Sequence, residues 1–184
     1  AAAEGARLMR AMSDTLAGAN SYSFSTSERL ETPGTAADRR ELLFTRDVVV
    51  LRPNALHFHV RGAEDNRADV SVYYDGQTLS LRDASRGVWA TTPVPATLDE
   101  MLDDVARRYS VPIPVADVIY SVPYEAFIGP DSTGGFAGRE TLDGKACVRL
   151  AYTDEVVGVQ IWIPSSGPAL PRRVELAYKL VPGA

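Results

Sequence analysis

The sequence predicts an α+β protein in which about ten antiparallel strands form a sheet that helices cover. Apolar and polar residues alternate in many stretches, which is typical of strands with one buried face. Asp75-Gly76 and Asp143-Gly144 are strong signals for tight hairpin turns between such strands. In two further stretches apolar residues recur at helical spacing, and these amphipathic helices can cover the apolar face of the sheet.

The 184-residue length fits one domain, 1–184, with a sizeable core. Within it we expect a helix at 4–17, strands over 20–92, a helical insert over 97–128 and strands over 133–181. Leu8, Met12 and Leu16 share one face of the first helix. The insert begins with a capping box, Thr97 to Glu100, and prolines then divide it into short apolar pieces.

The composition excludes several classes of protein. A formal net charge of -5 argues against binding to nucleic acid, which requires a clustered basic surface. No apolar run approaches the roughly 20 residues that span a bilayer, so we expect only peripheral contact with a membrane. The chain begins AAAEGARLMRAM, which fits a mature chain after removal of a signal peptide and predicts export. A trimmed chain would begin in the same way.

The only two histidines, His57 and His59, stand at alternate positions and could reach one ion. Zinc requires three or four protein ligands, and the single cysteine, Cys147, lies far away in sequence. The face that carries both histidines also carries Arg61, while Leu56, Phe58 and Val60 point the other way. We therefore interpret it as the solvent face and expect no metal site and no cofactor.

The sequence also gives little support for a catalytic site. The acids Asp99, Glu100, Asp103 and Asp104 could serve as catalytic carboxylates, but the charge order of the segment fits a capped helix start whose acids complement the helix dipole. No nucleophile motif or metalloprotease motif occurs, and nothing near Cys147 in sequence would activate its thiol. We expect a protein without catalytic residues.

Arg46 is unusual because it shares a strand face with apolar residues. In one interpretation the arginine lies near a strand end and reaches solvent, with its stem packed against the sheet. In the other it is a latch that donates to a carbonyl of a lid helix or loop and holds a cavity shut.

Two stretches of the sequence resemble a known group of bacterial proteins. LRPNALHFHV and YYDGQTLSLRDASRGVWATTP resemble the periplasmic lipoprotein carriers of the LolA/LolB type, through Arg52-Pro53, Leu56, Asp75-Gly76, Leu79 and Leu81. Nearly the whole chain also resembles the bacterial family called domain of unknown function 2092. The stretches that carry this second resemblance are YYDGQTL, TLDEMLDDVARRY, PIPVADVIYSVPYE, TLDGKAC, QIWI and LPRRVELAYK.

The resemblance implies a strongly curved, unclosed half-barrel whose concave face is covered by helices, and a periplasmic or otherwise exported protein. It also implies a non-enzymatic carrier that binds a lipid or an acylated protein. The residues expected to line its hydrophobic cavity are Leu42, Phe44, Val48, Val50, Phe58, Tyr74, Trp89, Ile161 and Leu176 from the sheet, with Leu102 and Ile119 from the helices.

Two other functions stay open. The same fold resembles the sensing domain of envelope-stress regulators, which would make the chain an interaction module with an envelope protein as its partner. A cofactor-free enzyme is also possible, because a fold does not fix a function. An exposed apolar patch would favour the first alternative, and a paired nucleophile and base would favour the second.

Overall fold

The computed structural model describes residues 2–31, 41–63, 67–110, 113 and 115–179. Parts of the predicted segments 20–92, 97–128 and 133–181 therefore lie outside the described residues. The elements are α1 (Ala2–Ala17), β1 (Ser21–Glu31), β2 (Glu41–Leu51), β3 (Ala55–Gly62), β4 (Asp69–Tyr74), β5 (Thr78–Asp83), β6 (Val88–Pro93), α2 (Leu98–Tyr109), the 3₁₀ helix η1 (Ala116–Val118), α3 (Pro123–Phe127), β7 (Thr133–Leu142), β8 (Lys145–Thr153), β9 (Val157–Pro164) and β10 (Arg173–Tyr178).

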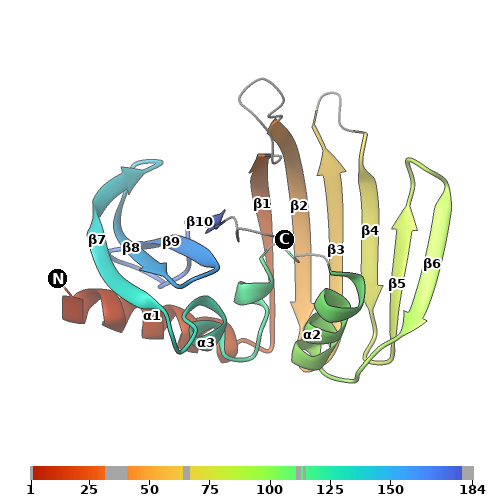
Figure 1. Cartoon of the computed structure of the whole chain (residues 1–184), viewed down its shortest axis with the longest axis horizontal. Helices are drawn as coiled ribbons and strands as arrows, with labels where there is room; N and C mark the ends of the chain where they lie inside the picture. The colour runs from red at the N-terminus through yellow and green to blue at the C-terminus, as the bar shows by residue number, and fades with distance from the viewer. Residues whose placement is uncertain (1, 32–40, 64–66, 111–112, 114, 180–184) are drawn as a thin grey trace. The chain divides into compact units, whose positions relative to one another are not determined.

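The strands form two antiparallel sheets, each of which is open at both ends (Figure 1). Six strands pair in the order β1-β2-β3-β4-β5-β6, and four pair in the order β10-β9-β8-β7. The chain divides accordingly into two compact units. One unit contains β1 to β6 with α2, and the other contains α1 together with the elements from η1 to β10. The predicted α+β class with unclosed antiparallel strands is confirmed, and the strands belong to two sheets.

The six-stranded sheet separates its residues cleanly onto two faces because side chains alternate along every strand. On one face, here called the inner face, Val50, Leu56 and Tyr74 lie side by side on three neighbouring strands and are buried. The next row of the same face contains Val48, Phe58 and Val72. The opposite or outer face carries Val49, His57 and Tyr73 in one row. The alternation in ALHFHV correctly predicted that Phe58 and the histidines lie on opposite faces.

Trp89 lies on the outer face, so the expectation that it faces inward with Phe58 is wrong. It pairs with Arg82, which pairs in turn with Ser71 in the row of His59, and its side chain is 59% exposed. The β5–β6 turn sets this register, because Val88 is the residue opposite Asp83. A change of one residue in register exchanges the two faces of a strand, and the apolar stretch VWA does not specify which face is buried.

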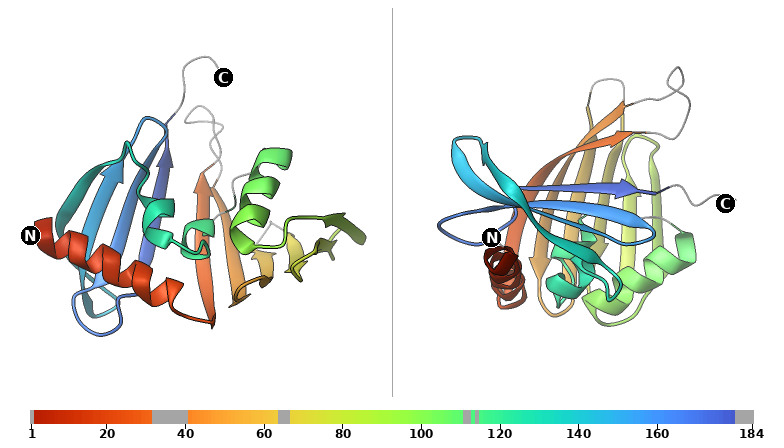
Figure 2. Two further views of the ribbon diagram at one scale, coloured as in Figure 1. Left: turned by 90° about the horizontal axis from the view of Figure 1, so that it is seen from below. Right: turned by 60° about the vertical axis from the view of Figure 1, so that its left-hand side comes forward.

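Helix α2 crosses the inner face of the six-stranded sheet (Figures 1 and 2). It begins as predicted, since the Thr97 hydroxyl accepts a hydrogen bond from the Glu100 N–H at 3.3 Å. Its apolar stripe is buried, and consists of Leu98, Met101 and Leu102. Tyr74 ties the sheet to the start of the helix, because its hydroxyl donates to the Pro95 carbonyl at 2.7 Å. The helix therefore covers part of the inner face.

In the other unit, α1 packs against β7, β8 and β9 of the four-stranded sheet. The helix buries Leu8, Met9, Met12 and Leu16, three of which were predicted to share a face. Gly5 permits a close approach, because a Cβ atom there would lie 2.8 Å from Leu150 Cδ2.

Candidate functional site

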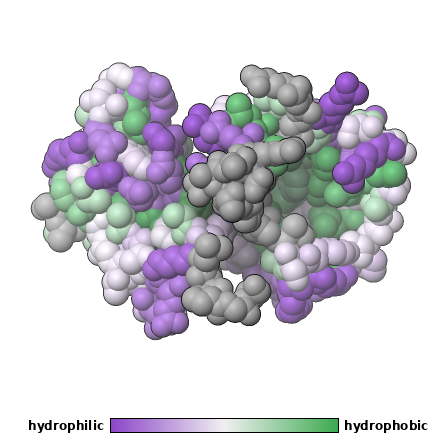
Figure 3. All heavy atoms as spheres, turned by 45° about the horizontal axis from the view of Figure 1, so that its top comes forward, coloured by the Kyte–Doolittle hydropathy of each residue, from purple (hydrophilic) through white to green (hydrophobic). Residues whose placement is uncertain are grey.

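The inner face of the six-stranded sheet is apolar well beyond the part that is buried. Its buried residues are Val48, Val50, Leu56, Val72 and Tyr74. Further apolar side chains of this face are half-buried or exposed, and we call them the open apolar surface: Leu30, Leu42, Phe44, Phe58, Val60, Val70, Leu81 and Val88. Figure 3 shows hydrophobic residues gathered in a hollow over this sheet, bordered by hydrophilic ones. Isolated exposed apolar residues are normal, whereas a contiguous group marks a binding surface.

The predicted cavity residues fall into distinct groups. Leu42, Phe44 and Phe58 belong to the open apolar surface. The structure buries another four of them in the core of the same unit: Val48, Val50, Tyr74 and Leu102. Ile119, Ile161 and Leu176 belong to the other unit, and Trp89 lies on the outer face.

Sequence reasoning did not include Val60, Val70 and Val88 among the cavity residues. The alternation in ALHFHV already placed Val60 on the apolar face with Leu56 and Phe58, although it was not counted as a cavity residue. Val70 and Val88 lie at strand ends, where only the register assigns a face.

Arg46 lies on the inner face as its position in the alternation predicted. It is 7% exposed, so the interpretation in which it reaches solvent is wrong. Its Nη2 donates to Glu28 Oε2 of β1 at 3.0 Å, and its guanidinium stands over the Phe58 ring at 5.4 Å from the ring centre. Thr26 completes the cluster by donating to Glu28 Oε1 at 2.6 Å. Burial lowers the pKa of Arg46, and the neighbouring Glu28 charge opposes that shift.

This cluster places a fixed charge pair on the apolar inner face. Asp83 is a second buried charge of this face, between Val70 and Val88, and pairs with Arg86 at 3.6 Å. One acceptor for Arg46 is the Glu28 carboxylate on the adjacent strand, whereas the latch interpretation expected a carbonyl of a lid helix or loop. The latch itself stays a prediction. Because Phe58 and Phe44 lie beside the pair on the same face, a ligand on the open apolar surface would lie next to it.

On the outer face, His59 already uses both ring nitrogens. Arg61 donates to its Nδ1 at 2.9 Å, so the proton lies on Nε2, which donates to Asp69 at 2.7 Å. Arg61 also pairs with Asp47, which accepts from Ser25 at 2.7 Å. In the described part of the chain no group of three or more His, Cys, Asp or Glu side chains could hold a metal ion.

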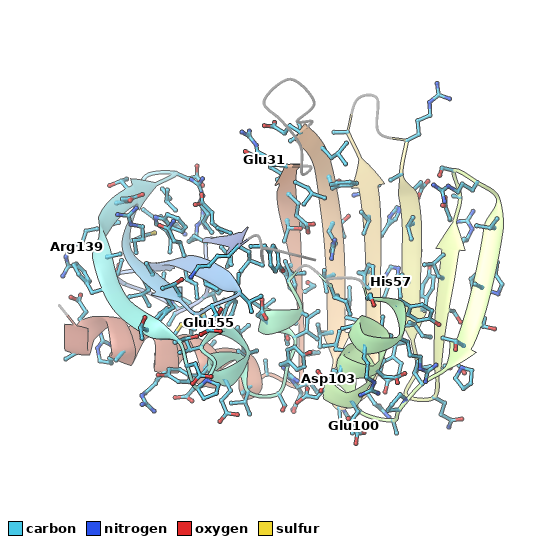
Figure 4. All side chains as sticks on the ribbon, viewed as in Figure 1. Glu31, His57, Glu100, Asp103, Arg139 and Glu155 are labelled. Atoms are coloured by element: carbon cyan, nitrogen blue, oxygen red, sulfur yellow. The ribbon has the colours of Figure 1, made fainter. Side chains whose placement is uncertain are left out.

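Two acids of α2, Glu100 and Asp104, contact groups of the same helix or of its N-cap. Asp104 is buried and pairs with Arg107 at 3.0 Å and with Arg108 at 2.6 Å, both on the same helix. Figure 4 shows Glu100 and Asp103 on α2 itself, and both are exposed. These contacts favour the interpretation of a capped helix whose acids and basic last turn complement the dipole.

Asp117 in η1 is a carboxyl group whose ionisation we expect to lower the stability of the fold. Burial raises its pKa from 3.8 to about 6. The folded state thus holds the proton more tightly than the unfolded state, and stability is lost as pH rises from about 4 through 6. At pH 8 the free energy of unfolding of Asp117→Asn should be higher than that of the native chain by roughly 1–2 kcal/mol. This difference in stability should become smaller as the pH falls towards 4. Urea denaturation at both pH values measures this.

The control for that prediction is Asp14→Asn, on the exposed side of α1. An equal gain in both variants, or a gain in Asp117→Asn that does not depend on pH, would contradict a desolvated carboxylate at position 117.

Comparison with known proteins points to the cell envelope. The model of the DUF2092 family, described as a predicted periplasmic protein, matches residues 5–184. No helix in the described residues is long and apolar enough to cross a membrane. No match was found among curated protein sequences.

Two solved structures are similar to this chain. One is a DUF1329 family protein from Desulfovibrio piger, with 13% identity and a TM-score of 0.39 over 97% of this chain and 74% of that one. The other is a domain from Vibrio parahaemolyticus whose name refers to outer membrane lipoprotein sorting, with 11% identity, a TM-score of 0.41 and the same two coverages. Both TM-scores are below 0.5, so we base the functional proposal on the family and on the residues of this chain.

Proposed function

Because the chain belongs to the DUF2092 family of predicted periplasmic proteins, we propose that it binds an apolar ligand in the periplasm, without catalysing a reaction. The ligand is a lipid or the acyl chain of a lipoprotein, and the protein acts as its carrier. The observation that carries this proposal is the open apolar surface, which leaves Leu81 37% and Val88 51% exposed on the inner face.

The chemistry of this surface suits an acyl chain. Each Å² of apolar area that the ligand and the surface remove from water contributes roughly 25 cal/mol, and no reactive group is required. Phe44 and Phe58 offer large flat side chains that are only half-buried. Val48 and Val50 lie beside them on the same face, but both are buried and do not reach a ligand.

Leu42→Ala tests the proposal against a matched neighbour, Leu43→Ala. The two leucines are adjacent on β2 and both half-buried, but only Leu42 belongs to the inner face. We expect Leu42→Ala to weaken binding of the fluorescent probe N-phenyl-1-naphthylamine by roughly fivefold to tenfold, because it removes about 1 kcal/mol of buried contact. Leu43→Ala should leave the affinity within about twofold.

Titration of the native chain and both variants by fluorescence gives the affinities. Equal effects in the two variants would contradict a site on the inner face. Native mass spectrometry of the protein purified from the periplasm supplies the second readout, and a lipid that co-purifies with the native chain and is lost from Leu42→Ala would support the carrier function.

The edge strand β6 favours a second candidate, an interaction module. Its stretch Val88 to Thr92 contains no charge, and it exposes Val88 on one face and Trp89 on the other. Natural edge strands are usually protected by charge, proline or a bulge, and an unprotected edge accepts a strand from a partner. In β6 the only such residue is Pro93 at its end, so the stretch Val88 to Thr92 stays available for pairing. A stable complex with an envelope protein that persists in Leu42→Ala would favour this candidate over the carrier.

A further inference from the structure

The outer face of the six-stranded sheet contains a shallow pocket that lies on the opposite side of the sheet from the open apolar surface. Its volume is about 370 Å³. His57 and Tyr73 line it from neighbouring strands, with their ring planes 17° from parallel and their ring centres 4.5 Å apart. Figure 4 shows His57 on β3. The lining residues are Val49, Leu51, Ala55, Leu56, His57, Tyr73, Tyr74, Asp75, Thr78 and Ser80.

The small residue beside Tyr73 leaves its ring open on one side. His57 covers one face of the ring, but the cross-strand neighbour on β5 is Ser80, whose side chain is too short to cover the other face. Tyr73 is accordingly 44% exposed. A flat molecule can therefore lie against Tyr73 above Ser80 and Thr78.

Several polar groups in this pocket have no partner among the described residues. His57 Nε2 is buried and makes no hydrogen bond there, which is costly for a polar atom. The hydroxyls of Tyr73, Thr78 and Ser80 form no side-chain hydrogen bond with a described residue. Asp75 Oδ1 accepts from the N–H groups of Gln77 at 3.0 Å and Thr78 at 2.8 Å, and its second oxygen accepts none from the described chain.

We propose that this pocket binds a sugar ring. A saccharide presents an apolar C–H face that fits against an aromatic side chain, and its edge carries hydroxyls that both donate and accept hydrogen bonds. The pocket offers the complementary set, with Tyr73 as the wall, three hydroxyls that donate or accept and the Asp75 carboxylate as an acceptor. Backbone hydrogen bonds from Thr78 and Gln77 hold the pKa of Asp75 below its usual range, so this acceptor is ionised at neutral pH.

Other ligand classes fit less well. An anion would be repelled by the Asp75 carboxylate. An acyl chain would contact Val49 and Leu51, but it would offer no hydrogen-bond partner to the hydroxyls or to the carboxylate. An organic cation would use Asp75 and the ring face, but would leave the donor capacity of Thr78 and Ser80 unused.

The test is a titration of the ¹⁵N-labelled protein with two soluble probes, the trisaccharides chitotriose and maltotriose. We expect at least one to bind at millimolar or lower concentration and to shift the amide signals of Tyr73, Thr78 and Ser80. Tyr73→Ala should weaken that binding roughly tenfold by removing the ring face. Tyr178→Ala, at a 62% exposed tyrosine in the other sheet, should leave it unchanged.

Ser80→Leu gives a second variant that retains every polar group of the pocket except one hydroxyl and fills the space beside Tyr73. It should abolish the binding while the protein stays folded, since position 80 points to the outer face. Sedimentation with peptidoglycan sacculi or with lipopolysaccharide then distinguishes an envelope glycan from a free oligosaccharide as the source of the ring. The proposal is overturned if neither trisaccharide shifts any signal at roughly 10 mM, or if the shifts fall on the inner face.

Discussion

Arg46→Leu should lower the free energy of unfolding by about 3 kcal/mol, because it leaves a largely buried carboxylate without its charged partner. The side chains of Arg46 and Glu28 are only 9% and 18% exposed, so water replaces the lost guanidinium only in part. The Thr26 hydroxyl still donates to Glu28, but one neutral donor does not compensate for the charge. The cost is therefore that of a desolvated acid rather than that of a lost contact.

A matched variant on the other face isolates this effect. Arg61 pairs with Asp47 across the same sheet, but these two side chains are 48% and 46% exposed. Arg61→Leu should cost less than about 1 kcal/mol, as exposed ion pairs generally do. Urea denaturation of both variants measures the difference, and losses of equal size would contradict the burial argument for Arg46.

The double variant Arg46→Leu/Glu28→Leu should recover most of the loss. Buried ion pairs replaced as a whole by apolar residues are often neutral in stability, whereas removal of one partner is strongly destabilising. A double variant that is no more stable than Arg46→Leu would show that Glu28 is not the group left unpaired.

Arg46→Leu also tests the latch. The guanidinium stands over Phe58, a residue of the open apolar surface, so its loss changes the polarity at the site that we propose for the ligand. Under the latch hypothesis the uptake or release rate of N-phenyl-1-naphthylamine changes while the variant remains folded. Identical binding kinetics in the native chain and the variant would exclude a latch and leave Arg46 as a structural residue.

The inner face could be predicted from the sequence because its signal is local. Leu42, Phe44, Val48 and Val50 alternate with polar or less buried residues along one strand, and no distant part of the chain is needed to place them together. The signal that predicts the start of α2 is also local, since Thr97 and Glu100 are three residues apart.

The remaining features depend on register and pairing, which alternation does not encode. Trp89 was misplaced because the turn before it sets which face β6 presents. The partner of Arg46 is 18 residues away, and only the β1–β2 register brings Glu28 within reach. For the same reason the division into two sheets could not be predicted, because alternation shows which residues share a face but not where a sheet ends.

Leu102→Ala should lower the free energy of unfolding by about 3 kcal/mol and at the same time increase binding of an apolar probe. Leu102 is 1% exposed and stands with Leu98 and Met101 in the buried stripe of α2. Truncation to alanine loses the transfer free energy of three carbon atoms and leaves a cavity beneath the helix.

The increase in probe binding distinguishes two roles of α2: a helix that covers a ligand-binding face, and a helix that only fills the core of its unit. If α2 covers an apolar face, loosening it exposes residues such as Val50 and Tyr74, which the native chain buries. Tyr109→Ala is the control, at a 54% exposed position of the same helix, and should change neither quantity appreciably. Hydrogen exchange should show faster exchange of the α2 amides in Leu102→Ala than in the control. A variant that loses stability but binds no additional probe would mean that α2 fills the core of this unit, and the ligand surface would then be confined to the residues that the native chain already exposes.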